Sequence, residues 1–133
     1  MISPNELQIG DWVLYGKGYA IIKAIGTHRS AILVSIDGQD ELIEETYDII
    51  DPIPLTDEIL RKSGFGCVDS DSELSHYYLG DPHYCADMNL HIGTDKKGCF
   101  WLNYYSNSIY GLIYVHELQH AFSLLGIEKE ITL

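Results

Sequence analysis

Two histidines and a glutamate near the C-terminus have the spacing of a zinc site. Residues 116–120 read HELQH, the H-E-x-x-H pattern of zinc metalloproteases. In that pattern the histidines lie one helical turn apart, so both imidazoles reach one ion while the glutamate acts as general base. One hypothesis is therefore a minimal zinc-dependent hydrolase, with His116 and His120 as ligands and Glu117 as the catalytic base.

The surrounding sequence favours a different interpretation, because no third ligand can be identified. The metzincin extension of the motif would need glycine and histidine where Ser123 and Gly126 stand. Glu128 and Glu130 follow the predicted helix too closely to fold back onto its face. We therefore expect no catalytic residue and no cofactor, and keep zinc as the alternative.

The helix that carries the motif has its own apolar pattern. Apolar residues recur at 3-and-4 spacing at Leu112, Val115, Leu118, Phe122 and Leu125. His116 and His120 lie nearly opposite this stripe, so we expect both to face water. An upstream ligand could still come from the segment DPHYCADMNLH, which contains His83, Cys85, Asp87 and His91. Ordinary strand and loop positions explain that segment as well.

Composition and charge exclude several classes of protein. The chain has 133 residues, 46 % of them hydrophobic, enough for one domain or two small lobes. The start MISPNELQIGD lacks a basic and an apolar signal region, so we expect a soluble, cytoplasmic protein that binds no membrane. Its net charge of −12 disfavours nucleic acid as a partner. The same charge leaves an acidic DNA mimic as a further alternative.

The fold that must position these residues is predicted to be α+β, in two parts that are either separate or merged into one domain. Residues 1–54 contain four short apolar segments, each ending at turn residues: 7–15, 19–25, 30–36 and 41–50. The opening GDWV and the succession of short strands resemble SH3-like barrels. We therefore predict a small SH3-like barrel of four or five strands, a fold that by itself implies no function.

Residues 55–133 are predicted to form a small antiparallel sheet packed on a long C-terminal helix. A short helix over 55–63 has Thr56 as its N-cap and Leu55, Ile59 and Leu60 toward the core. Residues 66–82 are predicted as a loop around a short strand at 75–79. Two strands follow at 84–92 and 98–104, and the long helix runs from about 109 to 125, with Gly126 at its C-terminal cap.

Seven of the ten tyrosines lie in the C-terminal part. Tyrosine is enriched at protein interfaces because its ring packs while its hydroxyl finds a partner. Aromatic residues also fill small cores and populate strands. We expect some of each, with an exposed interface patch around Tyr104, Tyr105 and Tyr110.

Three segments carry a resemblance to a known family: NELQIGDWV at 5–13, IDPIPLTDEILRKSGF at 50–65 and YVHELQHAF at 114–122. The chain resembles small proteins of intestinal anaerobic bacteria, their phages and their mobile elements, a family with no assigned function. In that family the third segment usually reads V-H-Q-L-Q-N, so Glu117 and His120 depart from it. The resemblance therefore implies that the shared role of the family does not depend on zinc bound at this motif.

Together these features predict a non-enzymatic interaction or accessory protein of phage or mobile-element origin. We expect its partner to be another protein or a second copy of this chain.

Overall fold

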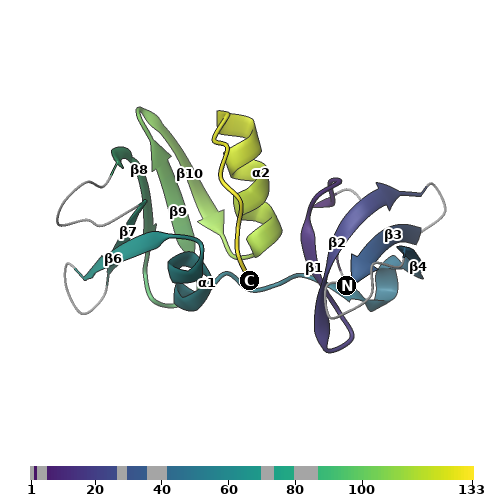
Figure 1. Ribbon diagram of the computed structural model, residues 1–133. Coiled ribbons are helices and arrows are strands. Elements are labelled where there is room, and N and C mark those ends of the chain that lie inside the picture. The colour runs from purple at the N-terminus through teal and green to yellow at the C-terminus, as the bar shows by residue number, and fades with distance from the viewer. Residues whose placement is uncertain (1, 3–5, 27–29, 36–41, 70–73, 80–86) are drawn as a thin grey trace. The chain divides into compact units, whose positions relative to one another are not determined.

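The computed structural model describes residues 2, 6–26, 30–35, 42–69, 74–79 and 87–133 (Figure 1). The chain divides into two compact units, Met1–Ile53 and Pro54–Leu133. Both units contain antiparallel sheets, and the second also contains two helices, so the protein is of mixed α+β class. Among the described helices, none combines the length and the apolarity that crossing a bilayer requires.

The first unit is a five-stranded antiparallel sheet in the order β4-β3-β2-β1-β5. Its strands are β1 (Trp12–Tyr15), β2 (Gly18–Ile25), β3 (Ser30–Ser35), β4 (Leu42–Thr46) and β5 (Ile50–Asp51). A 3₁₀ turn, Tyr47–Ile49, connects the last two, so the predicted segment 41–50 is two strands rather than one. Within the described residues no pairing joins the edge strands β4 and β5, and a closed barrel is not observed.

The core of the first unit follows from the alternation of side chains along its strands. Each of β1, β2 and β5 buries one or two apolar side chains, and residues before β1 and in the 3₁₀ turn complete the cluster. The cluster comprises Ile2, Leu7, Val13, Ala20, Ile22, Tyr47 and Ile50. Tyr15 packs against this cluster, and its hydroxyl donates to Oε1 of Glu45 at 2.6 Å.

The second unit is a meander of five antiparallel strands in the order β10-β9-β8-β7-β6. They are β6 (Phe65–Asp69), β7 (Ser75–Leu79), β8 (Asp87–Thr94), β9 (Phe100–Tyr104) and β10 (Asn107–Leu112). β7 lies where the sequence predicts it. β6 was predicted as loop, and this was wrong: its glycine and aspartate are poor strand formers alone, but all five residues pair with β7.

Two helices complete the second unit: α1 (Asp57–Lys62) and α2 (Val115–Leu125). Thr56 caps α1 as predicted, with its Oγ1 accepting from the backbone N–H of Ile59. The predicted start of the long helix was wrong, because residues 107–112 pair with β9 as a strand. Its end was predicted correctly: Gly126 is in the left-handed conformation with φ 71°.

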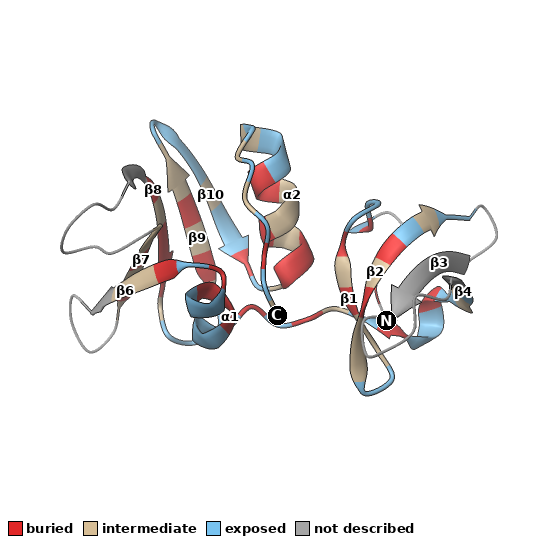
Figure 2. Cartoon of the chain, in the orientation of Figure 1, coloured by how far each residue is buried: buried red, intermediate tan, exposed pale blue. Residues whose placement is uncertain are grey.

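The core of the second unit lies between one face of the sheet and the helices. In Figure 2, buried and half-buried residues alternate along β9. We call the buried side the helix-facing face; it includes Phe65, Tyr77, Ile92, Phe100 and Leu102. Phe65 lies 6.3 Å from Phe122 of α2 between ring centroids, and the Tyr77 hydroxyl reaches Asp57 of α1.

Candidate functional site

The HELQH motif lies at the start of α2. His116 was predicted to face water, and this prediction was wrong. Its side chain is buried, with 3 % of its surface exposed, while His120 is half-buried. The ring of Tyr114 stacks on His116 with centroids 5.8 Å apart. The two histidine rings lie edge to face, 5.6 Å apart.

Helical periodicity does not predict the burial of His116, and the residues just before α2 pair with another segment of the second unit. The chain that leads into α1 runs beside the residues that lead into α2: Pro54 forms a β-bridge with Tyr114. The N–H of Leu55 donates to the carbonyl of Ile113 at 2.8 Å. The first turn of α2 is therefore flanked by another segment of its own unit and is not an open surface.

Glu117, the general base of the zinc hypothesis, has a structural role at the helix terminus. Its Oε1 accepts from the backbone N–H groups of Ile113 at 3.1 Å and Tyr114 at 2.9 Å. A carboxylate at this third helical position stabilises otherwise unsatisfied N–H groups and the positive end of the helix dipole. The residue that completes the motif thus contributes to the start of the helix.

The described residues do not supply a third zinc ligand near the motif. Within residues 2, 6–26, 30–35, 42–69, 74–79 and 87–133, no three histidine, cysteine or acidic side chains are grouped to hold a metal. His83 and Cys85 lie outside the described residues. His91, the remaining histidine of that segment, is on β8, on the face of the sheet opposite to the helices.

That opposite face is the first of two features with the chemistry of a binding site. Side chains alternate between the faces of a strand, and the strand register aligns one set on the side away from Tyr77 and Phe100. We call this set the outer face; its described side chains are His76, Tyr78, His91, Trp101, Asn103 and Ser108. No other described element of its unit covers this face, and both helices lie on the other side (Figure 1).

Trp101 lies flat on the sheet because its neighbour on β8 is glycine. Gly93 pairs with Trp101, and a Cβ atom at Gly93 would overlap the indole ring. The absence of a side chain at Gly93 therefore lets one face of the indole rest on the backbone. A flat aromatic ring on an uncovered sheet offers its other face to a partner.

Four polar side chains on the outer face form a hydrogen-bonded chain. Ser108 Oγ donates to Asn103 Oδ1 at 2.7 Å, which turns the amide Nδ2 toward His91 Nδ1 at 3.2 Å. His91 then carries its proton on Nε2, which lies 2.6 Å from Nδ1 of His76. Burial, and then the neighbouring His76, lower the pKa of His91 below its ordinary value, so His91 favours the neutral form.

The rings of this chain are also stacked. His91 lies between His76 and Tyr78, with ring centroids 4.8 Å and 5.1 Å apart and interplanar angles near parallel, 26° and 27°. The outer face therefore combines aromatic surface with fixed donors and acceptors, which is the composition of the centre of a protein interface.

The predicted tyrosine patch lies at one edge of the same sheet. Tyr105, in the turn between β9 and β10, and Tyr110 on β10 are 67 % and 73 % exposed. Tyr104 is half-buried, and its ring meets that of Tyr105 edge to face at 4.7 Å. Tyr110 lies in a bulge of β10, opposite Trp101 of β9. That these tyrosines form an interface stays a prediction. Their position is next to the outer face.

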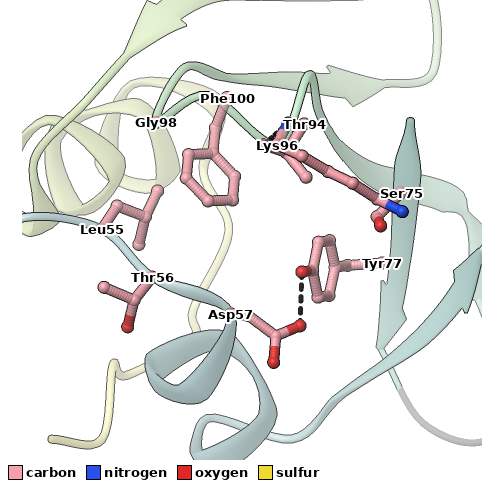
Figure 3. A pocket seen from close by; sticks show the side chains of 9 residues that line it. All are labelled: Leu55, Thr56, Asp57, Ser75, Tyr77, Thr94, Lys96, Gly98 and Phe100. Carbon is pink, nitrogen blue, oxygen red and sulfur yellow. Dashed lines mark hydrogen bonds between the residues drawn. The ribbon is translucent and has the colours of Figure 1, made fainter. Parts of the chain in front are cut away.

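The second feature is a pocket on the helix-facing face, with a volume of about 370 Å³ (Figure 3). Leu55 and Phe100 form an apolar wall, and the ring of Tyr77 lies across from them. Asp57 and Lys96 border the pocket at opposite edges in Figure 3. The volume is in the range of small-molecule sites, roughly 300–1,000 Å³.

The Tyr77 hydroxyl and Asp57 form a hydrogen bond at this pocket. The phenol donates to Asp57 Oδ1 at 2.6 Å, and Arg61 Nε donates to Asp57 Oδ2 at 2.8 Å. Burial, followed by the hydrogen bond to Asp57, raises the pKa of the Tyr77 hydroxyl above its ordinary value. Tyr77 therefore remains a neutral donor next to a carboxylate.

Comparison with known proteins adds no relative. No protein-family model matches the sequence, and neither the curated proteins nor the solved structures contain a match to the chain.

Sequence reasoning missed the residues that now define both features. His76 and Asp57 were predicted only as part of a strand and of a helix, and Lys96 lies between the strands predicted at 84–92 and 98–104. Each lies far along the chain from its partner: His76 is 15 residues from His91, and Asp57 is 20 residues from Tyr77. Residues 75–79 read SHYYL and show no alternation of polar and apolar types, so no local signal could have assigned His76 and Tyr78 to an outer face.

Proposed function

We propose that this chain is a non-enzymatic interaction protein whose contact surface is the outer face of the second sheet. The observation that carries the proposal is the composition of this face. Its described side chains include Trp101, Tyr78 and two histidines, and none is a carboxylate. The chain as a whole carries a net charge of −12. A neutral aromatic face on so acidic a protein is suited to burial against a partner.

The partner class that we propose is another protein. A nucleic acid would need basic groups to displace its counterions. The described outer face has no lysine or arginine, and the lowered pKa of His91 favours its neutral form. Trp101 and Tyr110 provide large rigid aromatic contacts, the side chains that most often dominate protein–protein binding. Phage or mobile-element origin and a cytoplasmic location, both expected from the sequence, belong to the same proposal.

Photo-crosslinking tests the surface directly. We would replace Tyr110 with the photoreactive p-benzoylphenylalanine and use Leu124 of α2, 79 % exposed, as the matched control position. We expect covalent adducts from position 110, including a dimer if the partner is a second copy, and few from position 124. The captured protein would then be purified, and Trp101→Ala should weaken the binary complex at least tenfold, about 1.4 kcal/mol. Equal adducts from both positions, or unchanged affinity, would reject the surface.

For the first unit we propose an SH3-like arrangement. Support comes from β1, which pairs with both β2 and β5, so that the last strand of the unit lies beside the first. The 3₁₀ turn before β5 redirects the chain to make this pairing possible. Chemical-shift and NOE data on residues 1–53 would test it: contacts between β4 and β5 across the open side of the sheet are expected, and their absence would leave an open sheet.

A measurement of metal content distinguishes the zinc hydrolase hypothesis from this proposal. Elemental analysis of tag-free protein purified without chelator should find no stoichiometric zinc in the native chain or in a His116→Ala/His120→Ala variant. Zinc at one ion per chain that disappears in the variant would instead restore His116 and His120 as ligands. The acidic DNA mimic stays a prediction and would be recognised by salt-sensitive binding to a DNA-binding protein.

A further inference from the structure

The pocket on the helix-facing face concentrates polar groups in a place where the rest of that face is apolar. Ser75 and Thr94 pair directly across β7 and β8, and both are buried. The next pair along the same two strands is Tyr77 with Ile92, also buried. A void left by imperfect packing would be lined by apolar side chains. This one combines an apolar wall with three hydroxyl residues, a phenol, a carboxylate and an ammonium group, which points to a ligand.

We infer that the pocket binds a small zwitterion of the amino-acid type. Its ammonium group would lie against Asp57 and the Tyr77 oxygen, its carboxylate against Lys96 and Ser75, and its apolar part against Leu55 and Phe100. This site is distinct from the proposed protein-binding surface, because the sheet lies between them.

The acidic end of the pocket can accept a cation without losing its present bonds. Asp57 Oδ1 accepts from Tyr77 and Oδ2 from Arg61, which leaves a second lone pair on each oxygen. Because Tyr77 donates its hydrogen to Asp57, its oxygen still offers lone pairs to the pocket. An ammonium group placed there would make charge-assisted hydrogen bonds to Asp57, the stronger kind in proteins.

The basic end is held by a rigid hairpin turn. Lys96 has a φ of 62°, a left-handed conformation that a residue with a side chain seldom adopts. Thr94 Oγ1 accepts from the N–H of Lys96 at 3.1 Å, and Asp95 Oδ1 accepts from the N–H of Lys97 at 2.8 Å. In Figure 3 the Lys96 side chain extends from this turn along the edge of the pocket. An ammonium group at this edge of the pocket is suited to a carboxylate.

The separation of the two charges selects the ligand class. Asp57 and Lys96 lie at opposite edges of the pocket, with Tyr77 and Phe100 facing each other between them (Figure 3). A simple anion would meet Asp57, and a metal cation would find a single carboxylate among the lining residues. A molecule that carries both charges and a short apolar group satisfies both ends and the wall at once.

Heteronuclear NMR on the full chain provides the test, with three probes: L-leucine, its amide and N-acetyl-leucine. The amide keeps the ammonium group and lacks the carboxylate, whereas the acetyl compound has the reverse. We expect saturable shifts at Ser75, Tyr77, Thr94 and Lys96 with leucine, and binding at least tenfold weaker for each derivative. Phenylalanine and alanine serve as further amino-acid probes, and failure of all three amino acids to produce saturable shifts at these residues would overturn the inference. Equal binding of leucine, its amide and N-acetyl-leucine would overturn it as well.

Neighbouring residues of the same type provide matched controls. Lys96→Met and Asp57→Asn should each weaken leucine binding about tenfold, because each removes one charge-assisted contact. Lys97→Met and Glu58→Gln change the same charges one residue away, at positions that do not line the pocket. Dispersed amide spectra show which variants are folded. Equal weakening by the control variants would mean that net charge alone governs binding, and the site would be rejected.

Discussion

The two faces of the second sheet differ although their residues alternate along the same strands. Trp101 and Leu102 are adjacent on β9, yet Leu102 is fully buried and Trp101 is half-buried. Tyr77 and Tyr78 are adjacent on β7, and only Tyr77 is buried and bonded to a helix residue. The comparison indicates that the helix-facing face holds the unit together, whereas the outer face keeps aromatic and imidazole groups accessible.

The largest expected difference is between the adjacent residues Leu102 and Trp101. Leu102→Ala should lower the free energy of unfolding by about 2–5 kcal/mol, because it leaves a cavity in the core. Trp101→Ala should cost only about 1–2 kcal/mol, since one face of its indole already meets solvent. Urea unfolding at 25 °C measures both. Equal losses would show that the outer face is covered as a second core.

A substitution at Gly93 tests whether Trp101 rests on the backbone of the outer face. Gly93→Ala should cost about 1–3 kcal/mol, because the new methyl group overlaps the indole of Trp101. In a Trp101→Ala background the same change should cost less than half as much, since the overlapping ring is gone. A double-mutant cycle of unfolding free energies measures this coupling. Additive effects would mean that Trp101 does not lie on Gly93.

The two adjacent tyrosines test the polar contacts of the faces. Tyr77→Phe removes the hydrogen bond to Asp57, and should cost about 1 kcal/mol because Asp57 is also partly solvated. Tyr78→Phe, the control on the outer face, should change the unfolding free energy by less than about 0.5 kcal/mol. Thermal unfolding followed by circular dichroism is sufficient. A larger effect for Tyr78 would reverse the assignment of the faces.

The smallest expected effect is the pH dependence of stability that arises from His91 on the outer face. Because the folded pKa of His91 is lowered, the unfolded chain binds the proton first as the pH falls below its value of about 6.5. The contribution of His91 is therefore complete above that pH and is lost as the pH falls to its lower folded pKa. His91→Gln should flatten this part of the profile. Histidine NMR titration checks the direction, and a His91 that titrates above 6.5 would contradict it.

Local features of this fold could be predicted from the sequence. Thr56 was correctly predicted to cap α1, Leu55, Ile59 and Leu60 to be buried, and Gly126 to end α2. Caps and turns depend on residues within a few positions of one another, so a single sequence contains their physical cause. The short strand at 75–79 was also predicted, and it pairs with β6 and β8.

The errors arose where local signals support two structures. Ser106, Asn107 and Ser108 are favourable both before a helix and in a tight turn, and the structure uses them at the turn into β10. Its turn residue Tyr105 has a φ of 54°, a left-handed conformation that a tyrosine in the sequence does not predict. His116 was assigned to water from the helical pattern alone, and the segment at Pro54 and Leu55 changes its surroundings.

The sequence by itself determined the α+β class, the positions of most elements and the acidity of the chain. Only the tertiary structure decided that His76 meets His91, that Asp57 meets Tyr77 and that the Glu117 carboxylate accepts hydrogen bonds at the start of a helix. The physical reason is that strand register and helix docking join residues far apart in the chain, and their energies depend on packing between elements rather than on propensities within them.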